Sequence, residues 1–93
     1  MCYTVYILYS ESLDLFYKGQ TKDLTDRLFR HNHGREKSTK PGIPWMLVWF
    51  TTKKSRSDAV ALEAKLKNMS KKNLASFINR HSEGIAGPDD PDR

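Results

Sequence analysis

Two short apolar segments near the start of the chain predict a β-hairpin. Residues Tyr3–Tyr9 (YTVYILY) and Leu15–Gln20 (LFYKGQ) are rich in β-branched and aromatic side chains, which favour strands. The polar segment Ser10–Asp14 separates them and predicts the turn. We therefore expect the chain to begin with two antiparallel strands.

A helix, a loop and a third strand are predicted next. Asp23 can cap a helix that runs to about His33 and stops at Gly34, since glycine is common just after a helix. The basic loop 35–44 (REKSTKPGIP) contains two prolines and a glycine. The continuous apolar run Trp45–Thr52 (WMLVWFTT) predicts a strand that is covered on both faces.

Helical spacing dominates the last third of the chain. Ser55 or Ser57 can cap a second helix, and Ser70 a third. The apolar residues that recur at helical steps are Ala59, Leu62, Leu66, Met69, Leu74, Phe77 and Ile78. Residues 82–93 are acidic, with Pro and Gly and few apolar side chains, so we expect a disordered tail.

The predicted order of elements is β-β-α-β-α-α. It favours a single α/β (α+β) domain over residues 1–81, in which helices flank a three-stranded, mostly antiparallel sheet.

The charge distribution indicates a polyanionic partner. The formal net charge is +5, and because residues 82–93 carry four acids and one base, residues 1–81 carry +8. Nucleic acid suits such a surface, although a merely soluble basic surface would have the same charge. Cys2 is the only cysteine, no signal peptide precedes the first strand, and no apolar run is long enough for a membrane span. We expect a cytoplasmic protein, monomeric by default.

Two tyrosines and a glycine mark the hairpin as a candidate site. If the turn is centred between Glu11 and Ser12, Tyr6 and Tyr17 lie directly opposite each other on one face of the sheet. An ordinary aromatic pair in the core is the commoner outcome for two strand tyrosines. Gly19, which weakens a strand, makes sense if something must approach the backbone closely there.

Two polar side chains on the first helix are a second candidate feature. Arg27 and His31 are four residues apart and share one helical face, whereas Leu24 and Leu28 point another way towards the core. Taken alone, an arginine and a histidine on a helix are usually a solvated face.

Glu63 lies beside the apolar stripe of the second helix. It is four residues before Lys67, so the two can form an ordinary surface ion pair. Alternatively, Glu63 is a metal ligand at the rim of the sheet, with water and phosphate completing the coordination.

In this order and spacing, these residues resemble the motifs of the GIY-YIG nuclease superfamily, above all its small stand-alone bacterial members. The likeness rests on Val-Tyr-Ile at residues 5–7, Tyr-Lys-Gly at 17–19, the segment GQTKDLTDRLFRHN at 19–32, and Glu63. It extends from about residue 3 to residue 80. The first tripeptide matches the family name only at its tyrosine, and the second has a lysine in its middle position.

The resemblance implies a metal-dependent, structure-selective endonuclease that hydrolyses phosphodiester bonds, in DNA rather than RNA. Tyr6 or Tyr17 would be the general base, with help from His31, and Arg27 would bind phosphate and offset developing charge. Glu63 would hold Mg²⁺ or Mn²⁺.

Lysine and arginine side chains would bind phosphates without reading sequence. The expected set is Arg30, Arg35, Lys37, Lys40, Lys53, Lys54, Lys67, Lys71 and Lys72. Selectivity would come from nucleic-acid structure, as in DNA repair, or from a targeting protein. The main alternative is a non-cleaving nucleic-acid-binding module with the same fold. A protein-interaction domain whose basic face meets an acidic partner is a third.

Overall fold

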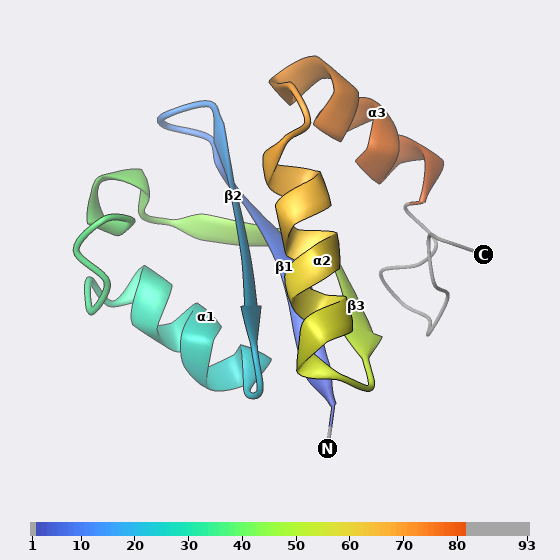
Figure 1. The fold of residues 1–93 in the computed structure, drawn as a ribbon. Helices are drawn as coiled ribbons and strands as arrows, with labels where there is room; N and C mark the ends of the chain where they lie inside the picture. Colours follow the sequence, from blue (N-terminus) through green and yellow to red (C-terminus); the bar gives the residue numbers. More distant parts are fainter. Residues whose placement is uncertain (1, 82–93) are drawn as a thin grey trace.

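The computed structural model describes residues 2–81, so the predicted tail 82–93 lies outside the described residues. The elements are β1 (Tyr3–Ser10), β2 (Leu15–Thr21), α1 (Leu24–Asn32), a 3-10 turn η1 (Lys40–Gly42), β3 (Trp45–Lys53), α2 (Arg56–Lys67) and α3 (Lys71–Arg80) (Figure 1). This confirms the predicted α+β class and the order β-β-α-β-α-α. Within the described residues, none of the helices has the length and apolar character needed to cross a membrane.

The three helices begin where their polar caps predict. Asp23, Ser55 and Ser70 each accept a hydrogen bond from the backbone N–H three residues later, at 3.0–3.1 Å. Such caps satisfy backbone donors that have no partner inside the helix. Of the two serines considered for α2, Ser55 is therefore the cap. After α1 the chain turns at Gly34, whose φ of 70° suits glycine.

The sheet is antiparallel throughout and has the order β2-β1-β3. Because β1 is central, its residues 5–8 are fully buried. The prediction of two-sided burial for the third strand is wrong for part of β3, an edge strand in which Met46 is 50% exposed. A bulge opposite Ile7 and Leu8 breaks the alternation of β3, so its apolar run does not indicate a central position.

The register of the hairpin differs from the prediction by two residues. Tyr6 pairs with Gly19 rather than with Tyr17, because the turn spans residues 11–14 and its centre is one residue later than expected. Asp14 closes it with a left-handed φ of 53°. A shift by two residues keeps each side chain on its original face. Tyr6 and Tyr17 therefore still share a face, as diagonal neighbours.

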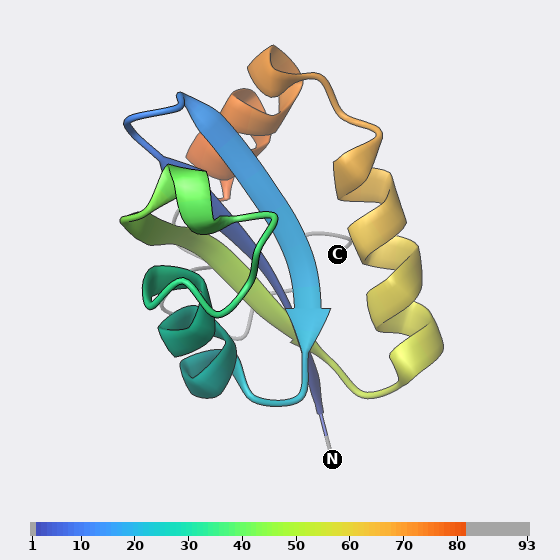
Figure 2. The ribbon, with the colours of Figure 1, turned by 90° about the vertical axis from the view of Figure 1, so that its left-hand side faces the viewer.

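Helices cover both faces of the sheet and create two cores. Figure 2 shows α1 and the η1 segment on one side of the sheet and α2 on the other. The core under α2 and α3 is apolar and consists of Val5, Ile7, Trp49, Ala59, Leu62, Leu66, Leu74 and Phe77. The core under α1 consists of Tyr6, Leu8 and Trp45, with Tyr17, Leu24, Leu28, Ile43, Leu47 and Phe50 packed against it. Both tyrosines of the candidate site belong to this second core.

Trp45 anchors the loop between α1 and β3. Its indole Nε1 donates a hydrogen bond to the Thr39 carbonyl at 2.7 Å. The Asn32 side chain accepts from the Trp45 backbone N–H at 2.6 Å and donates to the Trp45 carbonyl at 3.0 Å. Gly42 lies against the indole, where an added Cβ would be 2.3 Å from Cζ2. The loop is thus held against the second core.

We expect Gly42→Ala to destabilise the protein by about 1–3 kcal/mol, because the new methyl group overlaps the Trp45 ring. Denaturant unfolding monitored by tryptophan fluorescence measures the change. Gly34→Asn is the matched control. A Cβ at Gly34 would be 3.7 Å from its nearest neighbour, Cε of Lys40, and asparagine tolerates a left-handed backbone. Equal stability of the Gly42→Ala variant and the wild type would contradict the tight contact.

Candidate active site

Three aromatic side chains from three elements meet on the α1 face of the sheet. Tyr6 comes from β1, Tyr17 from β2 and His31 from α1. The ring centroids of Tyr6 and Tyr17 are 6.3 Å apart, and those of Tyr6 and His31 are 6.0 Å apart. The Tyr17 ring meets the His31 ring edge-on at 4.9 Å. The structure therefore brings these three sequence-predicted residues together, although Tyr6 and Tyr17 are not directly opposite.

A chain of hydrogen bonds runs through this cluster. The Tyr6 hydroxyl is 3.1 Å from His31 Nε2, and His31 Nδ1 is 2.8 Å from Thr39 Oγ1. Tyr6 is 0% exposed, His31 1% and Thr39 2%. Sequence reasoning missed Thr39, which lies in a loop interpreted only as basic, and no periodicity links it to His31. The available signal was a hydroxyl residue in the loop that follows the helix of His31.

Gly19 makes room for the Tyr6 phenol. A Cβ at Gly19 would be 2.7 Å from the Tyr6 hydroxyl oxygen and 3.1 Å from Cε2 of Tyr17. The close approach expected at Gly19 is therefore made by a side chain of the protein itself. A larger residue there would push the phenol away from His31.

The residues of α1 that face the sheet differ from the expectation. Leu24 and Leu28 pack against the core that contains Tyr6, and His31 is buried there as well. The expectation that the leucines point away from Arg27 and His31 is wrong. Residues 24, 27, 28 and 31 follow the i, i+3, i+4, i+7 spacing of one helical stripe. The half-buried Arg27 therefore lies at the edge of the same face.

The environment keeps the Tyr6 phenol neutral. Burial raises the pKa of Tyr6, and the neighbouring Tyr17 raises it further. The Arg27 guanidinium lowers the pKa of Tyr6, whereas the carboxylates of Glu63 and Glu36 raise it. All four side chains therefore lie within electrostatic reach of one phenol.

His31 is held as a neutral imidazole. Burial lowers the pKa of His31 below its ordinary value of 6.5. The Glu36 carboxylate opposes this shift, and the Arg27 guanidinium adds to it. A neutral histidine has one protonated and one unprotonated nitrogen, so it can accept a proton from one partner while it donates to another.

Glu63 lies on the other side of the sheet from α1 (Figure 2). It belongs to α2, which packs mainly against β1 and the edge strand β2. Its side chain is 17% exposed, and Oε2 is 3.1 Å from Lys67 Nζ, so the surface ion pair considered from the sequence is present. The same carboxylate raises the pKa of Tyr6, although burial and Tyr17 contribute more to that shift.

The donor atoms near Tyr6 fit a hard divalent cation only in part. Within residues 2–81, no three His, Cys, Asp or Glu side chains cluster tightly enough to hold a metal ion. Glu63 supplies one carboxylate, and Mg²⁺ is commonly bound by one or two carboxylates together with water and substrate phosphate. Glu63 is therefore a suitable single protein ligand.

The basic residues lie in three parts of the fold. The first group, Arg30, Arg35, Lys37 and Lys40, lies on α1 and the following loop, the segment that also carries His31 and Thr39. Arg30 Nε is 3.1 Å from Asp26 Oδ2, and the Arg35 guanidinium lies over the Phe29 ring. Lys67 is at the end of α2, and Lys71 and Lys72 open α3. Lys53 is the last residue of β3, and Lys54 follows it. The structure does not bring Lys71 to the first group.

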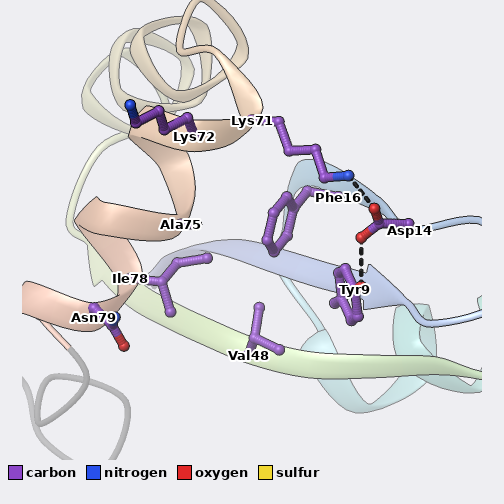
Figure 3. A pocket seen from close by; sticks show the side chains of 9 residues that line it. All are labelled: Tyr9, Asp14, Phe16, Val48, Lys71, Lys72, Ala75, Ile78 and Asn79. Carbon is purple, nitrogen blue, oxygen red and sulfur yellow. Dashed lines mark hydrogen bonds and ion pairs between the residues drawn. The ribbon is translucent and has the colours of Figure 1, made fainter.

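A cavity of about 680 Å³ lies elsewhere, between the hairpin and α3 (Figure 3). Its lining residues are Tyr9, Asp14, Phe16, Val48, Lys71, Lys72, Ala75, Ile78 and Asn79. Asp14 accepts a hydrogen bond from the Tyr9 hydroxyl and forms an ion pair with Lys71 at its rim. Phe16 and Val48 pack against the apolar core under α2 and α3, so the cavity is on the opposite face from the Tyr6–His31 pair.

The fold and the cluster define a small α+β domain with a tyrosine–histidine site on one face of its sheet. The chain belongs to the GIY-YIG catalytic domain family, which matches residues 2–86. This confirms the resemblance predicted from the motifs. The match extends beyond the domain boundary expected at residue 81.

The chain is also similar in sequence and in structure to several UPF0213 proteins. The UPF0213 protein lwe0147 of Listeria welshimeri is 38% identical over 69 residues, which cover 73% of this chain and 77% of the relative. The UPF0213 protein lin0209 of Listeria innocua is 36% identical over the same shares. The solution NMR structure of the UPF0213 protein BH0048 from Bacillus halodurans superposes with a TM-score of 0.59 at 26% identity, and covers 88% of this chain and 87% of that one.

We expect the buried His31 to make the protein sensitive to mild acid. The pKa of His31 in the folded state lies below 6.5, so the unfolded state binds the proton first. The free energy of unfolding should therefore fall as the pH drops below about 6.5. Tyr6, Tyr17, Glu36 and Arg27 are the ionisable groups that face this imidazole or act on it.

Denaturant unfolding between about pH 7.5 and pH 5.5 measures this dependence. His31→Gln should flatten the slope, whatever its effect on absolute stability, whereas His33→Gln should retain it because His33 is exposed. Parallel slopes for the wild type and His31→Gln would show that His31 is not the responsible group.

Proposed function

We propose that this protein is a metal-dependent endonuclease that hydrolyses phosphodiester bonds in DNA and selects its substrate by structure. The observation that carries this proposal is the buried Tyr6–His31 hydrogen bond in a domain of the GIY-YIG catalytic family. Arg27 and Glu63 act electrostatically on the same phenol, which supports a shared site. The endonuclease-type fold follows from the family, and the specific activity is our inference.

The proposed base is the pair Tyr6 and His31. Because the pKa of Tyr6 is raised, a free phenolate is scarce at neutral pH. Tyr6 can still act if its oxygen takes a proton from water while its own proton moves to His31 Nε2, 3.1 Å away. His31 would then carry the positive charge, near the Glu36 carboxylate that favours its protonated form.

Tyr17 is proposed to orient the attacking water. Its side chain is half-buried, and its hydroxyl makes no hydrogen bond within the described residues, so it is available to a substrate. Tyr6 is fully covered in the free protein. We infer that substrate binding shifts the Tyr17 ring and brings the water to the Tyr6 oxygen.

Arg27 and Glu63 are proposed to act on the phosphate. The guanidinium can donate two hydrogen bonds to phosphate oxygens and offset charge that develops during attack. Glu63 would hold Mg²⁺ or Mn²⁺, which supplies polarisation of the scissile phosphate. Lys67 would release the carboxylate for this purpose and could contact a neighbouring phosphate.

Nucleic acid is proposed to bind across α1 and the following loop. Arg30, Arg35, Lys37 and Lys40, on the same helix and loop as His31 and Thr39, would contact phosphates, and Lys67 on α2 would add a further contact. Contacts of this kind position the backbone without reading sequence, so selectivity would come from branched or flapped structures or from a targeting protein. Lys71 is paired with Asp14 beside the cavity of Figure 3 and is outside this surface.

We propose that the nuclease acts in the cytoplasm.

We expect Glu63→Gln and Arg27→Gln each to lower the nicking of supercoiled plasmid and branched DNA by at least about 100-fold with Mg²⁺ or Mn²⁺. Glu11→Gln, in the exposed hairpin turn, and Arg80→Gln, at the end of α3, are matched controls that should cleave normally. Unfolding curves establish that the variants fold.

The same assay separates the two main candidate functions. The complete burial of Tyr6 and the Glu63–Lys67 ion pair are the observations that favour a non-cleaving nucleic-acid-binding module. Wild-type protein that binds branched DNA but nicks nothing with either ion would support that module. Normal cleavage by both variants would mean that another site performs the reaction.

We expect the double variant Arg35→Gln/Lys37→Gln to bind DNA more weakly and with a smaller salt dependence. Loss of two phosphate contacts should lower the slope of log affinity against log salt by about 2. Fluorescence anisotropy at several salt concentrations measures the slope. Arg80→Gln removes one positive charge on the opposite layer and should leave the slope unchanged.

A further inference from the structure

The hydrogen bonds around His31 form one continuous buried chain. They run from the Tyr6 hydroxyl to Nε2 at 3.1 Å, from Nδ1 to Thr39 Oγ1 at 2.8 Å, and from Thr39 Oγ1 to the Glu36 carbonyl at 3.3 Å. The three side chains are at most 2% exposed. Each proton in the chain therefore needs a protein acceptor.

The last bond sets the direction of the others. A carbonyl oxygen carries no proton, so in this bond the Thr39 hydroxyl is the donor, and its oxygen is left to accept from His31 Nδ1–H. Nε2 of the neutral ring then has no proton and accepts from the Tyr6 hydroxyl. In the reverse arrangement the Tyr6 proton would have no acceptor among the described residues, which a buried hydroxyl disfavours.

We propose that Thr39 is a positioning residue that holds His31 as the Nδ1–H tautomer and so makes Nε2 the acceptor of the Tyr6 proton. The hydrogen-bond direction rests on the Thr39–Glu36 hydrogen bond and on the burial of the Tyr6 hydroxyl. Its catalytic consequence rests on the nuclease function proposed above.

Thr39 is held independently of His31, so it can orient the imidazole. Its carbonyl accepts from Trp45 Nε1 at 2.7 Å, and its N–H donates to Glu36 O at 3.1 Å. Asn32, the residue after His31, binds both backbone groups of Trp45. The helix that carries His31 and the loop that carries Thr39 are therefore tied to the same tryptophan.

The fixed tautomer gives the proton transfer a balanced course. As the Tyr6 oxygen takes a proton from the attacking water, the original Tyr6 O–H bond breaks and an N–H bond forms at Nε2 of His31. As the hydroxide forms its bond to phosphorus, the bond from phosphorus to the leaving ester oxygen breaks, and that oxygen takes a proton from solvent water. The imidazolium keeps Nδ1–H on Thr39. With the other tautomer Nε2 would already be protonated, and Tyr6 would have no acceptor for its proton.

The test combines NMR of the free protein with cleavage assays. In ¹⁵N-labelled wild type we expect a protonated-type resonance at Nδ1 of His31 and an unprotonated-type resonance at Nε2. Thr39→Val, which keeps the shape but removes the acceptor, should shift the ring towards the Nε2–H tautomer. It should also lower the cleavage rate by at least about tenfold. Thr39→Ser should restore both, and Thr25→Val, on the exposed side of α1, should change neither.

The His31 tautomer and the cleavage rate test the role of Thr39 and the proposed nuclease function separately. A wild-type Nε2–H tautomer, or an unchanged tautomer in Thr39→Val, would overturn the assignment to Thr39. A changed tautomer with undiminished cleavage would overturn its positioning role. If the wild type has the Nδ1–H tautomer and cleaves no DNA, the proposed function fails while the hydrogen-bond direction is supported. Thermal unfolding and the His31 spectra establish that the valine variant is folded.

Discussion

The hydrogen bond between Tyr6 and His31 connects the fold to the candidate chemistry. Tyr6 lies on the central strand, where a phenol is fully removed from water, and a buried hydroxyl needs a partner. His31 supplies that partner only when α1 lies against the sheet, and the imidazole in turn requires Thr39. The same contacts that dock α1 and its loop on the sheet therefore assemble the candidate active site.

The cores on the two faces of the sheet differ in composition. Under α2 and α3 the core is apolar and provides non-directional stability, as in most small domains. Under α1 the core is aromatic and polar, with each buried polar group of the Tyr6–His31–Thr39 chain paired. A fully paired network specifies one arrangement of side chains, whereas a partly paired one would be costly. Glu63 lies on α2, in the other layer, and its carboxylate raises the pKa of Tyr6.

The sequence predicted the order of elements, all three helix caps and the family, because these depend on short-range patterns. It predicted Tyr6 and Tyr17 on one face for a register that was wrong by two residues, since period-2 alternation survives such a shift. The two-sided burial expected for β3 failed because an apolar run does not distinguish a central strand from a bulged edge strand. The roles of the basic residues were assigned from charge alone, and the fold placed these residues in separate parts of the molecule.

What the sequence determined by itself is local: strands from alternation, helices from caps and stripes, and a stripe on α1 that contains Arg27 and His31. Only the tertiary structure decided that His31 is buried, that its other nitrogen faces Thr39, and that Gly19 accommodates the Tyr6 phenol. These contacts join residues distant along the chain, and they exist because Trp45 and Asn32 hold a loop whose path no local pattern encodes. Side-chain spacing limits which residues can meet, and packing between layers selects which of them do.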